Sequence, residues 1–298
     1  MAKTITVSSK PIQAILLKFI QNLLQPPPGM TIDFLHPAGA PALIAADSIS
    51  WRVFANPVSL FIGGVAAVLL ELAEPSVRSG VWDHSSFQRD PLTRLKRTGF
   101  AAMVTVYAPR EQAEKLIARV VKMHGHVKGQ TPDGLSYEAN DTRLLNWVQA
   151  TASFGFCEAY HQYVQPLTLA EKSQALAEGQ LPASLYGATG APSSWPAWEE
   201  LLTQTAPSLE SSDIIAEFLH IMERAPILPA PLRSLQKLLI NAAVEMTPEP
   251  VRSFAPLQSR GLNGVQRASV KILGRLARWL PLPGLPVNQA RQRMRSQH

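Results

Sequence analysis

Apolar residues recur along most of the chain with the spacing of one helix face, whereas the alternating pattern typical of strands is scarce. The pattern predicts a short amphipathic helix over Pro11–Leu24 and a buried helix over Pro57–Ala73, which Pro75 ends. Within the buried helix, Gly63-Gly64 predicts a close approach to a neighbour. Further helices are predicted at Asp90–Tyr107, Pro109–His124, Asn140 or Asp141 to Tyr163, Thr168–Glu178, Ala197–Gln204, Ser211–Arg224, Pro231–Val244 and Asn263–Trp279. The sequence therefore predicts an all-α fold.

The predicted helices follow one another without an internal repeat or a low-complexity linker, which favours a single large helical domain. Residues 1–45 are interpreted as an N-terminal helix with a covering loop, and residues 46–250 as the helical body. Residues 251–298 are interpreted as a basic C-terminal helix and tail packed on the same domain. Pro281, Pro283 and Pro286 are expected to break its last helix, and Gly125–Tyr137 carries the residues of a turn.

Composition limits the chemistry further. Of 298 residues, 46% are apolar and 17% are charged, which favours a large core and excludes intrinsic disorder. Cys157 is the single cysteine, so an intrachain disulfide and a cysteine-based zinc or iron–sulfur site are excluded. The apolar window Val58–Leu70 spans 13 residues, fewer than the roughly 20 that cross a bilayer. We therefore expect a cytoplasmic protein with a buried inert thiol.

Positive charge is concentrated at the C-terminal end. Residues 251–298 contain nine Lys and Arg and no acid, whereas the first 250 residues hold 19 basic and 22 acidic residues. Such a tail is typical of a patch for an anionic surface, either membrane or nucleic acid, and equally of a solvated helix. Because only Phe254 and Trp279 interrupt the charges as aromatics, no nucleic acid is expected. Peripheral contact with an anionic membrane stays open.

Arg94, Arg97 and Thr98 are the first candidate site residues. Familiar nucleotide, metalloprotease and hydrolase motifs (GxGxxG after a strand, GxxxxGK[ST], HExxH, GxSxG) are absent from the sequence. At spacings of three and four residues, these three side chains share one helix face. Two arginines on a largely apolar segment are costly unless they meet an anion such as a carboxylate. The alternative is a solvated face with ordinary ion pairs, which composition alone favours.

His124 is the second candidate, at the end of a predicted helix with an apolar face. Its position suits a partly buried imidazole, which is more often a satisfied core residue than a ligand. His126 lies about 200° further around a continuous helix, so both rings are not expected to serve one centre.

Sequence runs that resemble one family occur in the same order from Trp51 to Leu202. They are Trp51–Pro57 (WRVFANP), Gly63-Gly64, Leu69–Pro75 (LLELAEP), Val81–Ser85 (VWDHS), Asp90–Thr98 (DPLTRLKRT), Met123-His124, Val127–Gly129, Tyr137–Ala139 and Leu144–Val148 (LLNWV). This order resembles the mpaB-type oxygenases, once called DUF2236, and more distantly the latex-clearing rubber oxygenases. The resemblance makes residues 46–250 the catalytic part.

The resemblance implies haem b in a globin-like core, with His124 as the proximal iron ligand and Arg94 and Thr98 beside the haem. Arg97 completes the expected catalytic set. The implied function is a haem-dependent oxygenase that acts with dioxygen on an apolar substrate, such as an unsaturated or isoprenoid chain. The alternative is a non-catalytic haem- or lipid-binding protein at an anionic membrane.

Two positions depart from the family's pattern. Latex-clearing enzymes carry a lysine where this chain has Arg97, and a guanidinium is a poor iron ligand. Many relatives carry a histidine where this chain has Gln149, and an amide does not shuttle protons as an imidazole does. Haem binding is therefore a better supported expectation than a particular oxygenase activity.

Overall fold

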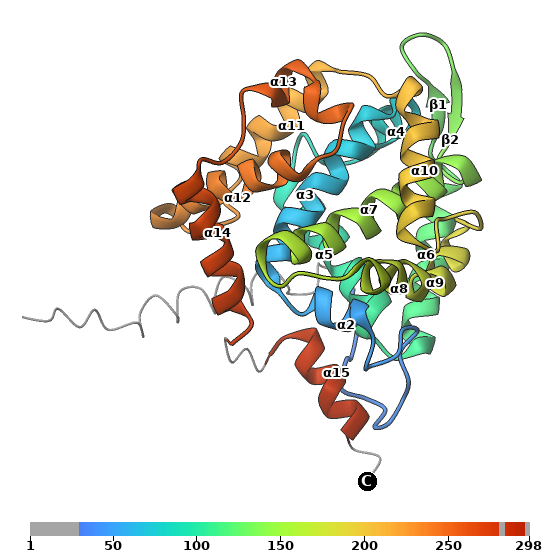
Figure 1. Ribbon diagram of the computed structural model, residues 1–298. Helices are drawn as coiled ribbons and strands as arrows, with labels where there is room; N and C mark the ends of the chain where they lie inside the picture. The colour runs from blue at the N-terminus through green and yellow to red at the C-terminus, as the bar shows by residue number, and fades with distance from the viewer. Residues whose placement is uncertain (1–29, 280–283, 296–298) are drawn as a thin grey trace, which may run out of the picture.

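The computed structural model describes residues 30–279 and 284–295. Helices make up most of this part of the chain (Figure 1), so the prediction of an all-α domain is confirmed. Its two short strands, β1 (Lys128–Gln130) and β2 (Ser136–Glu138), pair antiparallel around the turn predicted at Gly125–Tyr137. The helix predicted at Pro11–Leu24 lies outside the described residues.

Most helices have the predicted bounds to within two residues. The predicted helices are α3 (Pro57–Ala73), α5 (Pro91–Tyr107), α6 (Arg110–His124), α7 (Thr142–Tyr163), α8 (Leu169–Glu178), α10 (Trp195–Thr205), α11 (Asp213–Arg224), α12 (Arg233–Met246) and α14 (Gly264–Ala277). The helices that were not predicted are α2 (Ile49–Phe54), α4 (Pro75–His84), α9 (Gln180–Tyr186), α13 (Ala255–Gln258) and α15 (Pro286–Arg295). Side-chain caps explain several starts: Asp90 accepts from the backbone N–H of Thr93, Asp141 from that of Leu144, and Thr168 from that of Glu171.

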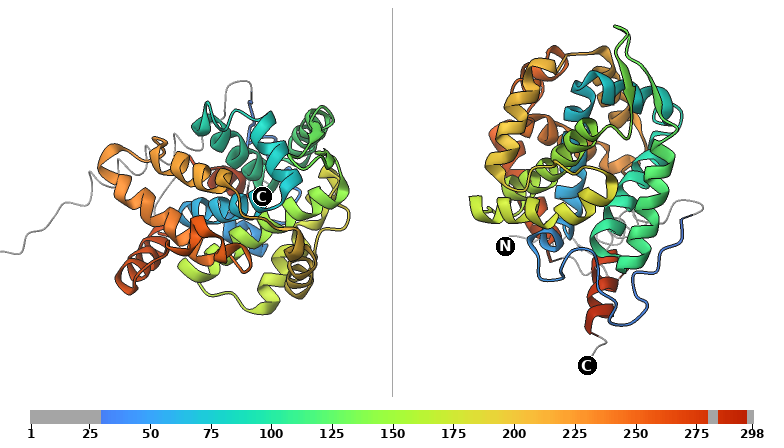
Figure 2. Two further views of the ribbon diagram at one scale, coloured as in Figure 1. Left: turned by 90° about the horizontal axis from the view of Figure 1, so that it is seen from above. Right: turned by 90° about the vertical axis from the view of Figure 1, so that its right-hand side faces the viewer.

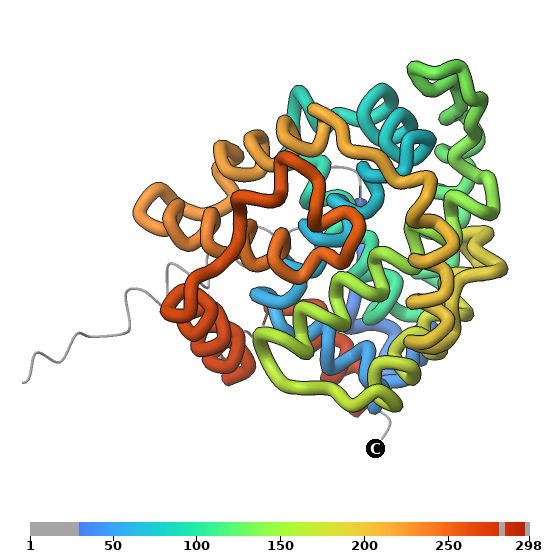
Figure 3. Tube along the Cα trace, turned by 45° about the horizontal axis from the view of Figure 1, so that its top comes forward, coloured from blue at the N-terminus to red at the C-terminus, as the bar shows by residue number. Residues whose placement is uncertain are grey.

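The two longest core helices, α3 and α7, cross near the middle of the molecule (Figure 3). They approach so closely at Gly63 and Gly155 that a Cβ on Gly63 would lie 2.6 Å from the Gly155 carbonyl oxygen. The close approach predicted for this glycine pair is confirmed at Gly63, whereas a Cβ on Gly64 would make only ordinary contact with Phe156. This close contact fixes the position of α3 relative to α7 in the core.

Two helices begin where the sequence suggested only a stop. Pro75 ends α3 and is also the first residue of α4, and Pro286 is the first residue of α15. Proline is favoured at the first helical position because its missing N–H has no partner there in any case. A proline between two apolar stretches therefore joins two helices as readily as it ends one.

A second core forms around α5, α6, α15 and the irregular segment 30–48. In this segment Phe34, Leu43 and Ile44 are buried, and the Trp51 indole N–H donates to the Ile44 carbonyl at 2.9 Å. The helix α15 lies beside the segment below the helical body (Figure 2, right). Both ends of the described chain therefore meet at this core.

One basic residue of the C-terminal region points into the protein instead of toward solvent. Arg293 is fully buried and donates to the carbonyl oxygens of Phe34, Ala40 and Tyr107 at 2.6, 2.8 and 2.8 Å. The prediction of a solvated or surface-binding tail is therefore wrong for Arg293, because three backbone acceptors replace its water shell.

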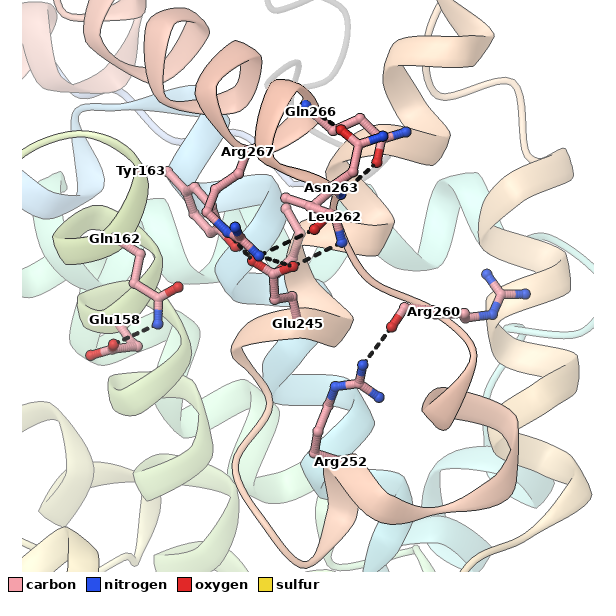
Figure 4. Close-up of polar contacts among 11 residues, drawn as sticks. Glu158, Gln162, Tyr163, Glu245, Arg252, Arg260, Leu262, Asn263, Gln266 and Arg267 are labelled. Atoms are coloured by element: carbon pink, nitrogen blue, oxygen red, sulfur yellow. Dashed lines mark hydrogen bonds and ion pairs between the residues drawn. The ribbon is translucent and has the colours of Figure 1, made fainter.

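Two further arginines of this region are engaged on neighbouring helices. Arg267 forms a two-point ion pair with Glu245 at 2.7 and 3.0 Å, and Arg252 donates to the carbonyl oxygens of Leu257 and Arg260 (Figure 4). Arg267 therefore joins α14 to α12, and Arg252 bonds to α13 and to the loop that follows it.

Among the described residues no single helix is both long and apolar enough to cross a membrane. The helices α3 and α4 meet that condition only as a pair, bent by 110° at their junction.

Candidate functional site

The helices α5 and α6 form an antiparallel hairpin that brings Arg94 and His124 to the same end. Residues 108 and 109 join the two helices, so Arg94 lies 14 residues before the connection and His124 lies 15 residues after it. At 1.5 Å per residue, both are about 21–22 Å from the turn. The positive charge of Arg94 acts on the His124 imidazole, as expected for groups at the same level.

His124 is partly buried at the last position of α6, as the sequence predicts. Its Nδ1 atom is buried and has no hydrogen-bond partner. Burial and the charge of Arg94 both lower the pKa of this imidazole. His124 is therefore a neutral ring with an unsatisfied nitrogen inside the protein, which a structural core histidine would normally not leave. His126, two residues on, is exposed.

The predicted face of Arg94, Arg97 and Thr98 forms on α5. The Arg94 guanidinium donates to the Thr98 hydroxyl, which in turn donates to the Arg94 carbonyl oxygen at 3.1 Å. Arg94 is partly buried, whereas Arg97 and Thr98 are exposed. Burial lowers the pKa of Arg94, and the nearby charge of Arg97 lowers it further. Both effects make a negative partner for Arg94 favourable.

That negative partner is Glu71, a residue that sequence reasoning did not single out. It lies near the end of α3, and its charge acts on Arg94. Burial raises the pKa of Glu71 to about 7, while the charge of Arg94 acts in the opposite direction. Part of its surface stays accessible, so this carboxyl group sits deep in the protein without being sealed off. A signal was present, because Glu71 is the first charge after the apolar run Val58–Leu70.

Two other residues of interest lie apart from this group. Gln149 on α7 is partly buried, donates weakly to the Ser153 hydroxyl at 3.5 Å and faces Gly179. Cys157 is buried among core residues, and burial raises the pKa of its thiol to about 12, so it is inert as predicted.

A partly buried histidine, an arginine and a carboxyl group with a raised pKa act on one another here, and groups with shifted pKa values are concentrated at functional sites. The chain belongs to the family described as ER-bound oxygenase mpaB/B'/Rubber oxygenase, catalytic domain, whose model matches residues 51–279. Comparison with curated proteins and with solved structures finds no match. The family resemblance noted from the sequence is thereby confirmed, and the matched region holds Glu71, Arg94, Arg97, Thr98 and His124.

The residues present fit a haem. No group of three or more His, Cys, Asp or Glu that could hold a metal ion occurs in the described ranges. Haem iron needs only one protein ligand on its proximal side, because the porphyrin supplies the four equatorial nitrogens. The unsatisfied, neutral imidazole of His124 is the kind of donor that iron requires. The arginines at positions 94 and 97 offer partners for anionic propionates.

Proposed function

We propose that this protein is a haem b-dependent oxygenase that acts with dioxygen on an apolar substrate. The family is an oxygenase catalytic domain, which supports the reaction class. The observation that supports a haem cofactor is the buried Nδ1 atom of His124. This atom has no hydrogen-bond partner, and the pKa of its ring is lowered.

His124 is proposed as the proximal iron ligand. A neutral imidazole offers a lone pair to a metal, and the lowered pKa keeps the ring neutral at physiological pH. Its position at the end of α6 is secured by the backbone, since the N–H of Val127 donates to the His124 carbonyl at 2.9 Å. When bound, the haem supplies a redox-active iron that binds dioxygen.

Arg94, Arg97 and Thr98 are proposed to orient the cofactor and the oxygen. Thr98 holds the Arg94 guanidinium in place on the helix surface, which lets the arginine face Glu71 and the cofactor together. Arg97 is exposed, and a guanidinium is a poor iron ligand but a good partner for carboxylates, so its proposed role is to pair with a haem propionate.

Glu71 is proposed to hold and release a proton at its carboxyl oxygens. A group with a pKa of about 7 has both forms populated near neutral pH, the condition under which a general acid or base is most effective. The charge of Arg94 stabilises the ionised form once the proton has left.

The substrate class rests on the family. Its description names rubber oxygenases, and rubber is an apolar, unsaturated polymer of isoprene units. We extend this to the present chain as an unsaturated or isoprenoid substrate, oxidised at a carbon–carbon double bond. Oxygen consumption with such compounds tests this substrate class. Equal rates in the wild type and in Glu71→Gln would show that Glu71 takes no part in the reaction.

The visible absorption spectrum of the purified protein, with haem precursor during expression and a reconstitution step, tests the cofactor. We expect a Soret band that shifts on reduction and on addition of carbon monoxide. His124→Ala is expected to lose the band while the protein stays folded by circular dichroism. His126→Ala is the matched control, because it removes an exposed ring two residues away and is expected to keep the haem. A folded wild type without the band, or full haem retention in His124→Ala, would overturn the proposal.

A further inference from the structure

The outer surface of α14 carries an unusual concentration of exposed apolar side chains. Among the described residues nine large apolar side chains are exposed; three of them belong to α14, and a fourth, Trp279, lies two positions after its end. Val265, Ile272, Leu276 and Trp279 are 78%, 57%, 60% and 79% exposed. Their spacings of seven, four and three residues place them on one face of the helix, as a continuous stripe.

A basic stripe runs beside the apolar one. Lys271, Arg275 and Arg278 follow one another at spacings of four and three residues, and the Arg278 guanidinium lies 5.9 Å from the centre of the Trp279 ring. Neither Lys271 nor Arg275 has an ion-pair partner within the described ranges. No acid occurs from Val251 onward to neutralise them.

The third face of α14 is held tightly by the protein. Gly274 packs so closely on the end of α7 that a Cβ there would lie 2.3 Å from the Tyr163 carbonyl oxygen. The Asn56 amide donates to the Gly274 carbonyl at 2.8 Å, and Val270 and Ala277 are buried. The helix is thus fixed at one edge of the molecule (Figures 1 and 3), with its apolar and basic stripes turned outward.

A cavity of about 290 Å³ lies between the end of α7 and α14, and Arg267, Lys271 and Arg275 line it on the side of α14. The Arg267 charge is balanced by Glu245 (Figure 4), which leaves Lys271 and Arg275 for an anion from outside. The hollow therefore offers a phosphate group two cationic partners next to the apolar stripe.

We propose that the α14 ridge, formed by Val265, Lys271, Ile272, Arg275, Leu276, Arg278 and Trp279, docks on the surface of an anionic phospholipid bilayer. The apolar stripe enters the boundary between headgroups and acyl chains, where Trp and Leu are favoured. Lys271 and Arg275 bind lipid phosphates, with the cavity at the end of α7 receiving one of them. This combination of stripes is typical of a helix that lies in a membrane interface.

Charge separates the bilayer from other occupants of the ridge. Residues 1–29 of the same chain contain three lysines and no acid, so this segment repels the basic stripe. A second copy of the protein, docked symmetrically, would bring two basic stripes together. An anionic lipid surface complements both the apolar and the basic stripe, and the same lysines of residues 1–29.

Flotation of the full-length protein with vesicles tests the proposal. Vesicles of phosphatidylcholine alone and vesicles with about one third phosphatidylglycerol give the two arms, at low and at high salt. We expect binding to the anionic vesicles that weakens with salt, and little binding to the neutral ones. Absence of binding to anionic vesicles at low salt would overturn the proposal. The readout is binding alone, so its outcome is independent of the haem assignment.

Two matched pairs of variants locate the surface. Lys271→Gln/Arg275→Gln/Arg278→Gln is expected to weaken binding roughly a hundredfold, since each basic residue near an anionic surface contributes about fivefold. Arg224→Gln/Arg233→Gln/Lys237→Gln removes three exposed charges from α11 and α12 and is the control. An equal loss in the control would mean that net charge alone governs binding and would overturn the proposal.

A second matched pair of variants tests the apolar stripe. Ile272→Ser/Leu276→Ser is expected to weaken binding at least tenfold, whereas Leu135→Ser/Leu169→Ser changes side chains that are 54% and 59% exposed elsewhere and has little effect. If the stripe variant binds like the wild type while the charge variant does not, the ridge serves a polyanion such as a nucleic acid and the proposal fails. If the stripe variant instead converts a dimer into a monomer and vesicles never bind, a second copy occupies the ridge.

Trp279 gives a direct signal of insertion. The tryptophans at positions 51, 147, 195 and 198 are buried and Trp82 is partly buried, whereas Trp279 is 79% exposed and lies on the ridge, so Trp279 is the one expected to respond to lipid. A blue shift of the emission and quenching by brominated acyl chains are expected with anionic vesicles, and Trp279→Phe should remove both. A blue shift that persists in Trp279→Phe would place the contact elsewhere and overturn the proposal.

Discussion

Two arginines in the interior show how differently the same side chain is used. Arg293 on α15 is fully buried, and its guanidinium donates to three backbone carbonyls. Arg94 on α5 is partly buried and bonds to the Thr98 hydroxyl on its own helix; its charge acts on the Glu71 carboxyl group and on the His124 imidazole, whose Nδ1 has no hydrogen-bond partner. The hydrogen bonds of Arg293 stabilise the fold, whereas near Arg94 the Nδ1 atom of His124 stays without a partner.

The difference matters because buried polar groups are normally satisfied, so an exception calls for a reason. At Arg293 each of the three guanidinium nitrogens donates to a backbone carbonyl oxygen. Around Arg94 the Glu71 pKa is raised to about 7 and the His124 Nδ1 is unpaired. Neutral or unpaired groups near a charge are the expected state of a site prepared for an incoming partner.

The largest effect is expected from Arg293→Met, which keeps the apolar stem and removes the donors. Three buried carbonyls lose their partner at a cost of about 1–3 kcal/mol each, so a loss of about 4 kcal/mol in the free energy of unfolding is expected. Urea unfolding measures it, with the exposed Arg295→Met as the control. A loss of less than about 1 kcal/mol would show that Arg293 is not structural.

The next largest effect is expected from Glu71, through pH. Its folded pKa of about 7 lies above the usual glutamate pKa of 4.5, so between these values the folded state holds a proton that the unfolded state has lost. Stability therefore falls as pH rises from about 4.5 to 7, by at most about 3 kcal/mol, since part of the side chain meets solvent.

Glu71→Gln should flatten this part of the pH profile, because an amide does not titrate. Unfolding by urea between pH 4.5 and 8 measures the change. Glu138→Gln replaces an exposed carboxyl group on β2 and serves as the control. An unchanged slope of stability against pH in Glu71→Gln would show that the Glu71 carboxyl group titrates normally. It would contradict the raised pKa of Glu71 in the site beside Arg94.

Arg267 should fall between the two interior arginines. It pairs with Glu245 at two points, yet it is exposed, so Arg267→Gln is expected to cost about 1 kcal/mol or less. Salt should reduce this difference, whereas it should leave the cost of Arg293→Met nearly unchanged. Unfolding with and without added salt makes the distinction; a salt-independent loss would contradict it.

The smallest effect is on the His124 pKa. Arg94→Met removes a positive charge that lowers the pKa of this imidazole, so the pKa should rise. An NMR titration of the imidazole in haem-free protein measures the shift. Arg97→Met is the control, because Arg97 acts on Arg94 and is exposed. A fall in the His124 pKa in Arg94→Met would contradict the arrangement of the site.

The sequence was sufficient for much of the fold. Periodicity and caps predicted α3, α5, α6, α7 and α8 almost to the residue, because each begins at a proline or a capping side chain and ends in a clear breaker. The turn at Gly125–Tyr137 was predicted, whereas the strands β1 and β2 beside it and the helices α2, α4, α9, α13 and α15 were missed. The two strands are only three residues long, and at α4 and α15 a proline gives the same signal for a stop as for a start.

The site was predictable only in part, for a physical reason. Arg94, Thr98 and His124 lie on the faces that helical spacing indicates, and their proposed roles stay predictions. Glu71 comes from α3, and only the folded protein creates the burial that raises its pKa and the nearness of the Arg94 charge on α5. In the same way, nothing in the basic composition of residues 251–298 distinguishes buried Arg293 from exposed Arg295, because the difference is made by Phe34, about 260 residues earlier.

The hydrogen bonds of Arg293 also affect the order in which parts of the protein fold during translation. The carbonyls of Phe34 and Ala40 are among the first described groups to be synthesised, and the side chain that satisfies them is among the last. Until residue 293 has left the exit tunnel, segment 30–48 has no anchor at that point, although the helices between them are complete. The contacts of Arg293 in the second core can therefore form only after residue 293 has been translated, whereas the crossing of α3 and α7 can form much earlier.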